Sequence, residues 1–203
     1  MIHLPVDLKT LGFIQREKKN GITVIYKCNR DFLYYTLHYF YPALFNQNVN
    51  NPQEIDKKGL FGIALPPILA WTLLPICKVP KYFKQHSLKL SINKKEIHNY
   101  YDLAYSILWS RISYDEAIHI AEKTIKEGNV VAIDIAFRFQ GLEDHILFVY
   151  GYDEENFYVF DTHKVPGLAY EKLTNDEGFY MKISKTEVKK RWKRFSRVWK
   201  VSN

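Results

Sequence analysis

A histidine and an aspartate stand at the two ends of a segment whose pattern predicts a β-hairpin. His145 opens an apolar run that ends at Tyr150, a polar turn follows, and a second β-rich run leads to Asp161. Antiparallel strands joined by a turn bring their outer ends side by side, so we expect these two side chains to meet. A carboxylate beside an imidazole forms the orienter and base of a nucleophilic triad. The plainer interpretation is a polar strand end and a turn carboxylate.

The triad also requires a nucleophile, a Cys or Ser near the start of a helix, and Cys28 is the best candidate. It lies directly before a predicted helix that starts near Asn29. A helix N-terminus and a nearby imidazolium both favour the reactive thiolate. Cys77 ends an apolar segment and precedes no helix start of this kind, so it is the weaker candidate. The plainer interpretation of Cys28 is a small buried residue at a strand–helix junction.

Several short motifs follow one another in the C-terminal half. Gly128 precedes the predicted strand VVAIDI, His145 opens the next strand, which runs into VYGYD, and YVFD ends the third. The stretch ISKTEVKKRW, residues 183–192, follows. In order and spacing these motifs resemble the papain-like peptidase C39 group, with the last stretch similar to the family's final helix and its Trp. The resemblance is clear over residues 113–201 and looser before them.

The resemblance implies a papain-like α+β fold, in which an N-terminal helical part packs on a C-terminal antiparallel sheet. We expect a single domain over residues 1–203, with a loop insertion around residues 46–58. By resemblance, Cys28 is the nucleophile, His145 the general base and acid, and Asp161 the orienter of the imidazole. The implied activity is that of a cysteine peptidase, a thiol protease, acting on a peptide or acyl carbonyl through a thioester. Water or an amine could be the acceptor, so hydrolysis and acyl or amide transfer both remain open.

Two departures from the family pattern keep a second interpretation open. The family has Gly and Pro directly after the catalytic Cys, where this chain has Asn29 and Arg30. The family also has a Gln about six residues before the Cys, whose amide helps to form the oxyanion hole, and here that position is Ile22. Gln15, on the opposite arm of a predicted hairpin, could supply the amide instead. The alternative is a catalytically inactive binding or scaffold protein with the same fold.

The expected elements follow from local signals. Ser113 and Glu116 form a capping box that predicts a helix over 114–126, ended by Gly128. Asn-Gly predicts a tight hairpin near residue 20. Asp134 alternates with apolar neighbours and is expected on a polar strand face. We expect strands at 130–137, 145–150, 157–160 and 179–183, and an edge strand at 197–201. Helices first and an antiparallel sheet second indicate an α+β fold.

Positive charge is concentrated near the C-terminus. Residues 185–200 hold eight Lys and Arg and one Glu, a net charge of +7 that equals the +7 of the whole chain. A predicted basic helix over 185–197 carries the candidate basic surface, which consists of Lys189, Lys190, Lys193, Arg194 and Arg197. Such a surface suits nucleic acid, an acidic partner or an anionic membrane surface. The plainer interpretation is the solvated face of an amphipathic helix.

The composition argues against several classes of protein: membrane-spanning, secreted, disulfide-rich and metal-binding. The chain contains no apolar stretch of about 18 residues, so we expect no membrane-spanning helix. The first residues show no signal-peptide pattern. Two cysteines make no disulfide framework and fit a reducing compartment. No CxxC or HxxxH pair is present, so we expect no metal site and no cofactor. We therefore expect an intracellular, cytoplasmic protein that acts on a peptide or protein substrate.

Overall fold

The computed structural model describes residues 1–5, 18–19, 22–23, 36, 39–41, 83–138, 143–161, 167–173, 180–194 and 196–203. The expected insertion around 46–58 lies outside these residues, as does most of the helix expected to start near Asn29. Thr36, Tyr39 and Phe40 are helical, which agrees with that expectation where it can be compared. Statements about the fold below concern the described ranges.

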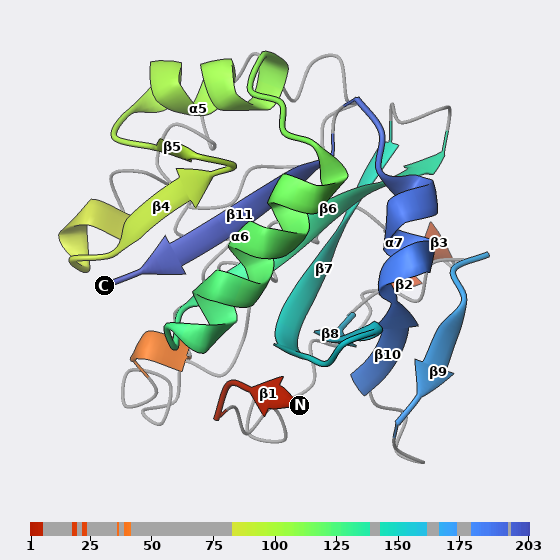
Figure 1. Cartoon of the computed structure of the whole chain (residues 1–203). Helices are drawn as coiled ribbons and strands as arrows, with labels where there is room; N and C mark the ends of the chain where they lie inside the picture. The colour runs from red at the N-terminus through yellow and green to blue at the C-terminus, as the bar shows by residue number, and fades with distance from the viewer. Residues whose placement is uncertain are drawn as a thin grey trace.

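A large antiparallel sheet forms the centre of the fold (Figure 1). Its strand order is β5-β4-β11-β6-β7-β8-β10-β9, and β1 pairs separately with β7. The strands are β1 (Ile2–His3), β4 (Lys89–Ile92), β5 (Lys95–Glu96), β6 (Val130–Arg138), β7 (Glu143–Tyr152), β8 (Asn156–Phe160), β9 (Tyr170–Lys172), β10 (Tyr180–Ser184) and β11 (Arg197–Ser202). Every strand pair described in this sheet is antiparallel. With the helices described next, this gives the expected α+β class.

The described helices with defined bounds are α5 (Tyr100–Leu108), α6 (Tyr114–Lys126) and α7 (Lys185–Arg191). In Figure 1, α6 crosses in front of β11 and β6, α7 lies beside β10, and α5 lies near β4 and β5. A separate small hairpin pairs β2 (Lys18–Lys19) with β3 (Ile22–Thr23). Lys19 pairs with Ile22, so the hairpin expected at the Asn-Gly dipeptide is confirmed.

Both ends of α6 follow from the sequence. The Ser113 side chain accepts a hydrogen bond from the Glu116 amide, and the Glu116 carboxylate accepts one from the Ser113 amide, so the capping box is complete. At the other end Gly128 has φ +74°, a conformation that favours glycine. Its amide donates to Ile125, and the next amide donates to Thr124, which is the Schellman pattern of helix termination.

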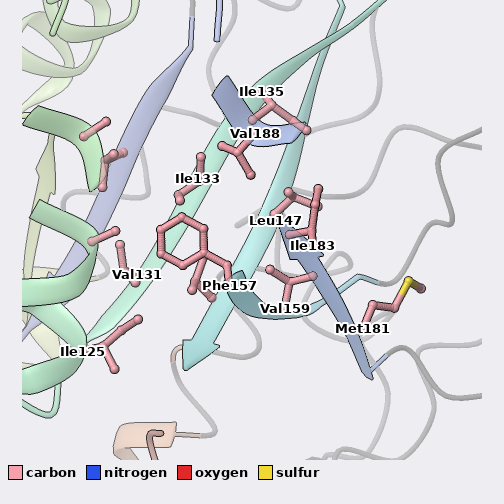
Figure 2. Packing of buried hydrophobic residues seen from close by; sticks show 14 of the residues in the cluster. Ile125, Val131, Ile133, Ile135, Leu147, Phe157, Val159, Met181, Ile183 and Val188 are labelled. Atoms are coloured by element: carbon pink, nitrogen blue, oxygen red, sulfur yellow. The ribbon is translucent and has the colours of Figure 1, made fainter. Parts of the chain in front are cut away.

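The sheet is buried on both faces, because alternate residues of its central strands belong to two apolar clusters. One cluster contains Val130 and Phe148 from the sheet together with Leu103 from α5. The other packs the opposite strand face against α6 and α7 (Figure 2). In Figure 2, side chains of β6, β7, β8 and β10 converge with Ile125 of α6 and Val188 of α7. These strands are therefore apolar on both sides, and a polar residue within them marks a specific interaction.

Two expectations about the C-terminal segment are wrong. The strand at the C-terminus is not an edge strand, because β11 pairs with β4 on one side and β6 on the other. The basic helix ends at Arg191 instead of continuing to Arg197, and Arg197 is the first residue of β11. The shorter helix follows from Trp192, whose extended backbone ends it. Residue 195 lies outside the described ranges.

Candidate functional site

The β7–β8 hairpin places His145 and Asp161 on one face of the sheet. His145 pairs with Ile135 and alternates in step with Leu147, which belongs to the cluster under α6 and α7. Asp161 directly follows β8 and alternates in step with Val159 of the same cluster. Phe148 pairs with Phe160, so Asp161 falls opposite Leu147, one same-face position from His145. The predicted meeting of the two side chains is a consequence of this register.

The two side chains form a buried hydrogen bond. Nε2 of His145 lies 2.9 Å from Oδ1 of Asp161, and the residues are only 4% and 0% exposed. A carboxylate only accepts hydrogen bonds, so the proton of the neutral imidazole is placed on Nε2. Nδ1 then carries the lone pair and is the nitrogen able to exchange a proton with another group. The arrangement is that of a general base oriented by a carboxylate.

Tyr170 is a further member of this site. Its hydroxyl donates to Oδ2 of Asp161, the oxygen that His145 does not use. Burial, and then the Asp161 charge and hydrogen bond, raise the pKa of Tyr170 far above its ordinary value, so the hydroxyl stays protonated. The sequence carries no clear signal for this residue, because its place beside Asp161 depends on two strand pairs, β9 with β10 and β10 with β8.

The other predicted members of the site, Cys28 and Gln15, lie outside the described residues, as does the rival thiol Cys77. Ile22, where the resemblance to the C39 group would place a Gln, is described and pairs with Lys19 in the small hairpin. The structure thus brings together His145 and Asp161, while the thiol and the amide remain sequence-based predictions.

Comparison with protein-family models, curated proteins and solved structures finds no match. The buried histidine–aspartate pair and the local motifs are therefore the basis for any functional argument. Within the described ranges, no cluster of three or more His, Cys, Asp and Glu residues could hold a metal ion. None of the helices in those ranges combines the length and apolar character needed to traverse a bilayer.

The candidate basic surface is smaller than expected. Lys189 and Lys190 are exposed on α7, and Lys193 and Arg194 are exposed just after it. Arg197 is 4% exposed and donates from Nη1 to Oδ2 of Asp134 at 2.8 Å, so it does not belong to the surface. The expectation of a surface Arg197 is wrong because this residue begins an interior strand.

Intramolecular contacts also engage much of the charge of α7. Nζ of Lys185 bonds to Glu122 at 2.7 Å and is only partly exposed. Glu187 lies 3.6 Å from Nζ of Lys190 and 3.1 Å from Nε of Arg191. Nζ of Lys189 lies 5.4 Å from the centre of the Tyr114 ring. These contacts favour the interpretation of α7 as a packed amphipathic helix over a dedicated polyanion surface.

Proposed function

We propose that the protein is a papain-like cysteine hydrolase in which Cys28 is the nucleophile, His145 the base and acid, and Asp161 the orienter. The observation that carries this proposal is the buried 2.9 Å hydrogen bond between Nε2 of His145 and Asp161. A buried imidazole with one nitrogen held by a carboxylate and the other able to take a proton suits thiol activation. The order Cys28, His145, Asp161 along the chain and the motifs that resemble the C39 group support the same assignment.

The proposed reaction proceeds through a thioester. Nδ1 of His145 takes the Cys28 thiol proton, and the sulfur attacks the carbonyl carbon of a peptide or acyl substrate. The Cys28 amide and, across the hairpin, the Gln15 side chain would stabilise the oxyanion, a contribution of roughly 3 kcal/mol per donor. The tetrahedral intermediate collapses as Nδ1 returns the proton to the leaving group. Water or an amine then gives its proton to Nδ1 and attacks the thioester. The second tetrahedral intermediate expels the Cys28 sulfur, which takes the proton back from Nδ1 as the product leaves.

Site-resolved alkylation tests the proposal without a known substrate. The rate of iodoacetamide modification at Cys28 and Cys77 is measured by mass spectrometry across pH, with Cys77 as an internal reference. We compare the wild type with His145→Gln, which retains an amide donor for Asp161, and with His119→Gln on the exposed face of α6. Cys28 should react rapidly below neutral pH in the wild type and in His119→Gln, and slowly in His145→Gln.

One observation favours a second candidate, an inactive binding protein of the same fold. Ile22 occupies the position of the family's oxyanion amide. Ordinary alkylation of both cysteines in all three proteins would support this candidate and overturn the hydrolase proposal. Turnover that survives in Cys28→Ala would also overturn the assigned nucleophile.

A further inference from the structure

We propose that Tyr170 is a positioning residue that fixes the Asp161 carboxylate, and through it the His145 ring, in the orientation required for proton transfer. This inference rests on the proposed function for its catalytic meaning. Its structural basis is separate: Asp161 is fully buried, with His145 bonded to one carboxylate oxygen and Tyr170 to the other.

Occupation of both oxygens restricts the carboxylate. Rotation about its terminal side-chain bond would break the bond to His145, the bond to Tyr170, or both. A buried charge that loses a donor keeps its desolvation cost, so such rotation is disfavoured. Without the Tyr170 hydroxyl, Oδ2 would lose this donor and the carboxylate would be held less firmly, while His145 would still bond to Oδ1. The His145 ring would then move together with the carboxylate and would no longer be held in one orientation.

Tyr170 itself is held by contacts on both sides of its position. It pairs with Ile183 across β9 and β10, and its amide donates to Leu168 at 3.1 Å. The Gly167 carbonyl, at the start of the same described segment, accepts a hydrogen bond from Nη2 of Arg191. This bond links the end of α7 to the segment that leads into Tyr170.

The Arg191 side chain is fixed in turn, because its Nε donates to Glu187 at 3.1 Å within α7. A basic residue of α7 thus has a role in the site's framework and not in a basic surface. The framework extends from Glu187 through Arg191 and Gly167 to Tyr170 and ends at the Asp161 carboxylate.

The simpler alternative is that the hydroxyl only satisfies a buried carboxylate and has no effect on the imidazole. The two possibilities differ in the state of His145. A held carboxylate fixes the neutral ring as the tautomer with its proton on Nε2, and a loosely held one allows a mixture. Nitrogen NMR of labelled histidine reports this tautomer directly and does not require Cys28 to be the nucleophile.

The test compares the wild type with Tyr170→Phe and with a matched control, Tyr114→Phe. The control removes a hydroxyl that donates to the neutral Lys185 carbonyl at 2.6 Å, so it makes the same chemical change away from Asp161. We expect the His145 signals to shift toward mixed tautomers in Tyr170→Phe only. In the same variant, Cys28 alkylation should slow by about tenfold to a hundredfold, as expected for a small misplacement of a catalytic group.

If the His145 nitrogen signals of Tyr170→Phe match those of the wild type, the positioning role is overturned. A tautomer shift without any His145-dependent reactivity of Cys28 would leave the positioning role intact and overturn the hydrolase proposal, so the two failures are distinguishable. If Tyr170→Phe does not fold, the wild-type protein decides the matter. Its His145 nitrogen signals should then report a single neutral tautomer with the proton on Nε2, and a mixture of tautomers would contradict the proposal.

Discussion

Arg197 and Asp134 face each other across β11 and β6 and are joined by a hydrogen bond of 2.8 Å between Nη1 and Oδ2. Both side chains are almost completely buried. They lie on the sheet face opposite to the His145–Asp161 pair, since Asp134 alternates with Ile133 and Ile135 of the cluster under α6. Within the described residues, each face of the sheet therefore holds one buried hydrogen-bonded pair of a carboxylate and a basic side chain.

Removal of one partner of the Arg197–Asp134 pair should strongly destabilise the fold. Arg197→Met leaves Asp134 buried without this cation, and we expect the free energy of unfolding in urea to fall by about 3–5 kcal/mol. Lys182→Met is the control, because the Lys182–Glu171 pair lies at the surface, with Glu171 exposed and Lys182 partly exposed, and should contribute no more than about 1 kcal/mol. The double variant Asp134→Leu, Arg197→Met should recover much of the loss. Equal effects of the two single variants would contradict the buried-pair argument.

Asp161→Asn should impair the site while preserving its shape. The Asn amide can donate to Nε2 of His145, which places the imidazole proton on Nδ1, the nitrogen needed as the base. In a nucleophilic triad this tautomer change lowers turnover by up to about 10⁴-fold. We expect Cys28 alkylation below neutral pH to fall to the rate of Cys77 with the circular dichroism unchanged. Unaltered Cys28 reactivity would show that a charged carboxylate is not needed to orient the base, since the Asn carbonyl can also accept from Nε2.

The Asp153 turn should make stability depend on pH. The Tyr158 hydroxyl is the main cause that lowers the pKa of Asp153 from 3.8 to about 2, with the Asn156 and Glu155 amides adding to the effect. A lowered folded-state pKa means stability that is present above the unfolded value and lost as the pH falls through the folded value. The wild type should therefore lose its advantage over Asp153→Asn between about pH 4 and pH 2. A difference that stays constant across that range in urea unfolding would refute the assignment.

Loss of the Ser113 cap should weaken the start of α6. Ser113→Ala removes the acceptor for the Glu116 amide, which we expect to cost about 1 kcal/mol in urea unfolding. Ser202→Ala in β11 serves as a control outside any helix. Hydrogen exchange should also become faster at the Glu116 amide in the first variant. Equal stabilities of the two variants would argue against the capping box.

Gly151 should be required for the pairing of β1. A Cβ atom at this position would lie 2.8 Å from the Ile2 carbonyl oxygen, so Gly151→Ala must displace β1 or β7. We expect a loss of about 1–3 kcal/mol and faster exchange of the Leu4 amide, which donates to Tyr150. Gly128→Ala is the comparison, because it strains a positive φ without a steric contact within 4 Å. In Gly128→Ala, hydrogen exchange at the Leu4 amide should be no faster than the loss of global stability accounts for.

The elements of the fold that could be predicted depend on signals between residues close in the sequence. The capping box of α6, the Asn-Gly hairpin and the β7–β8 hairpin each depend on residues close in sequence, and all three are found. The predicted meeting of His145 and Asp161 is found, but the hairpin turn alone does not set it. A β-bulge between Val149 and Gly151 shifts the register by one residue and so brings Asp161 to the face of His145, and the sequence carries no signal for that bulge. The proximity of the two residues could therefore be predicted from the sequence, whereas the register that creates it could not.

Non-local pairing accounts for what was not predictable. The sequence does not show that β11 enters the sheet between β4 and β6, so Arg197 looked like a surface cation and Asp134 like a polar-face residue. The burial of both side chains depends on a partner strand far away in the chain. Tyr170 was missed because no strand was expected at β9, which pairs with the next strand, β10, and through β10 is linked to β8.

The interior position of β11 also affects how the sheet is assembled during synthesis. The Val198 amide bonds to the Asn93 side chain, a separation of 105 residues, and β11 is the last of the described strands to be translated. Until it is made, β4 and β5 have no connection to β6 through the sheet, and two unpaired strand edges remain open. Long-range closures of this kind are slow and leave such edges exposed to other chains. A nascent protein interrupted before residue 197 would thus be a particular target for chaperones that bind exposed β-structure.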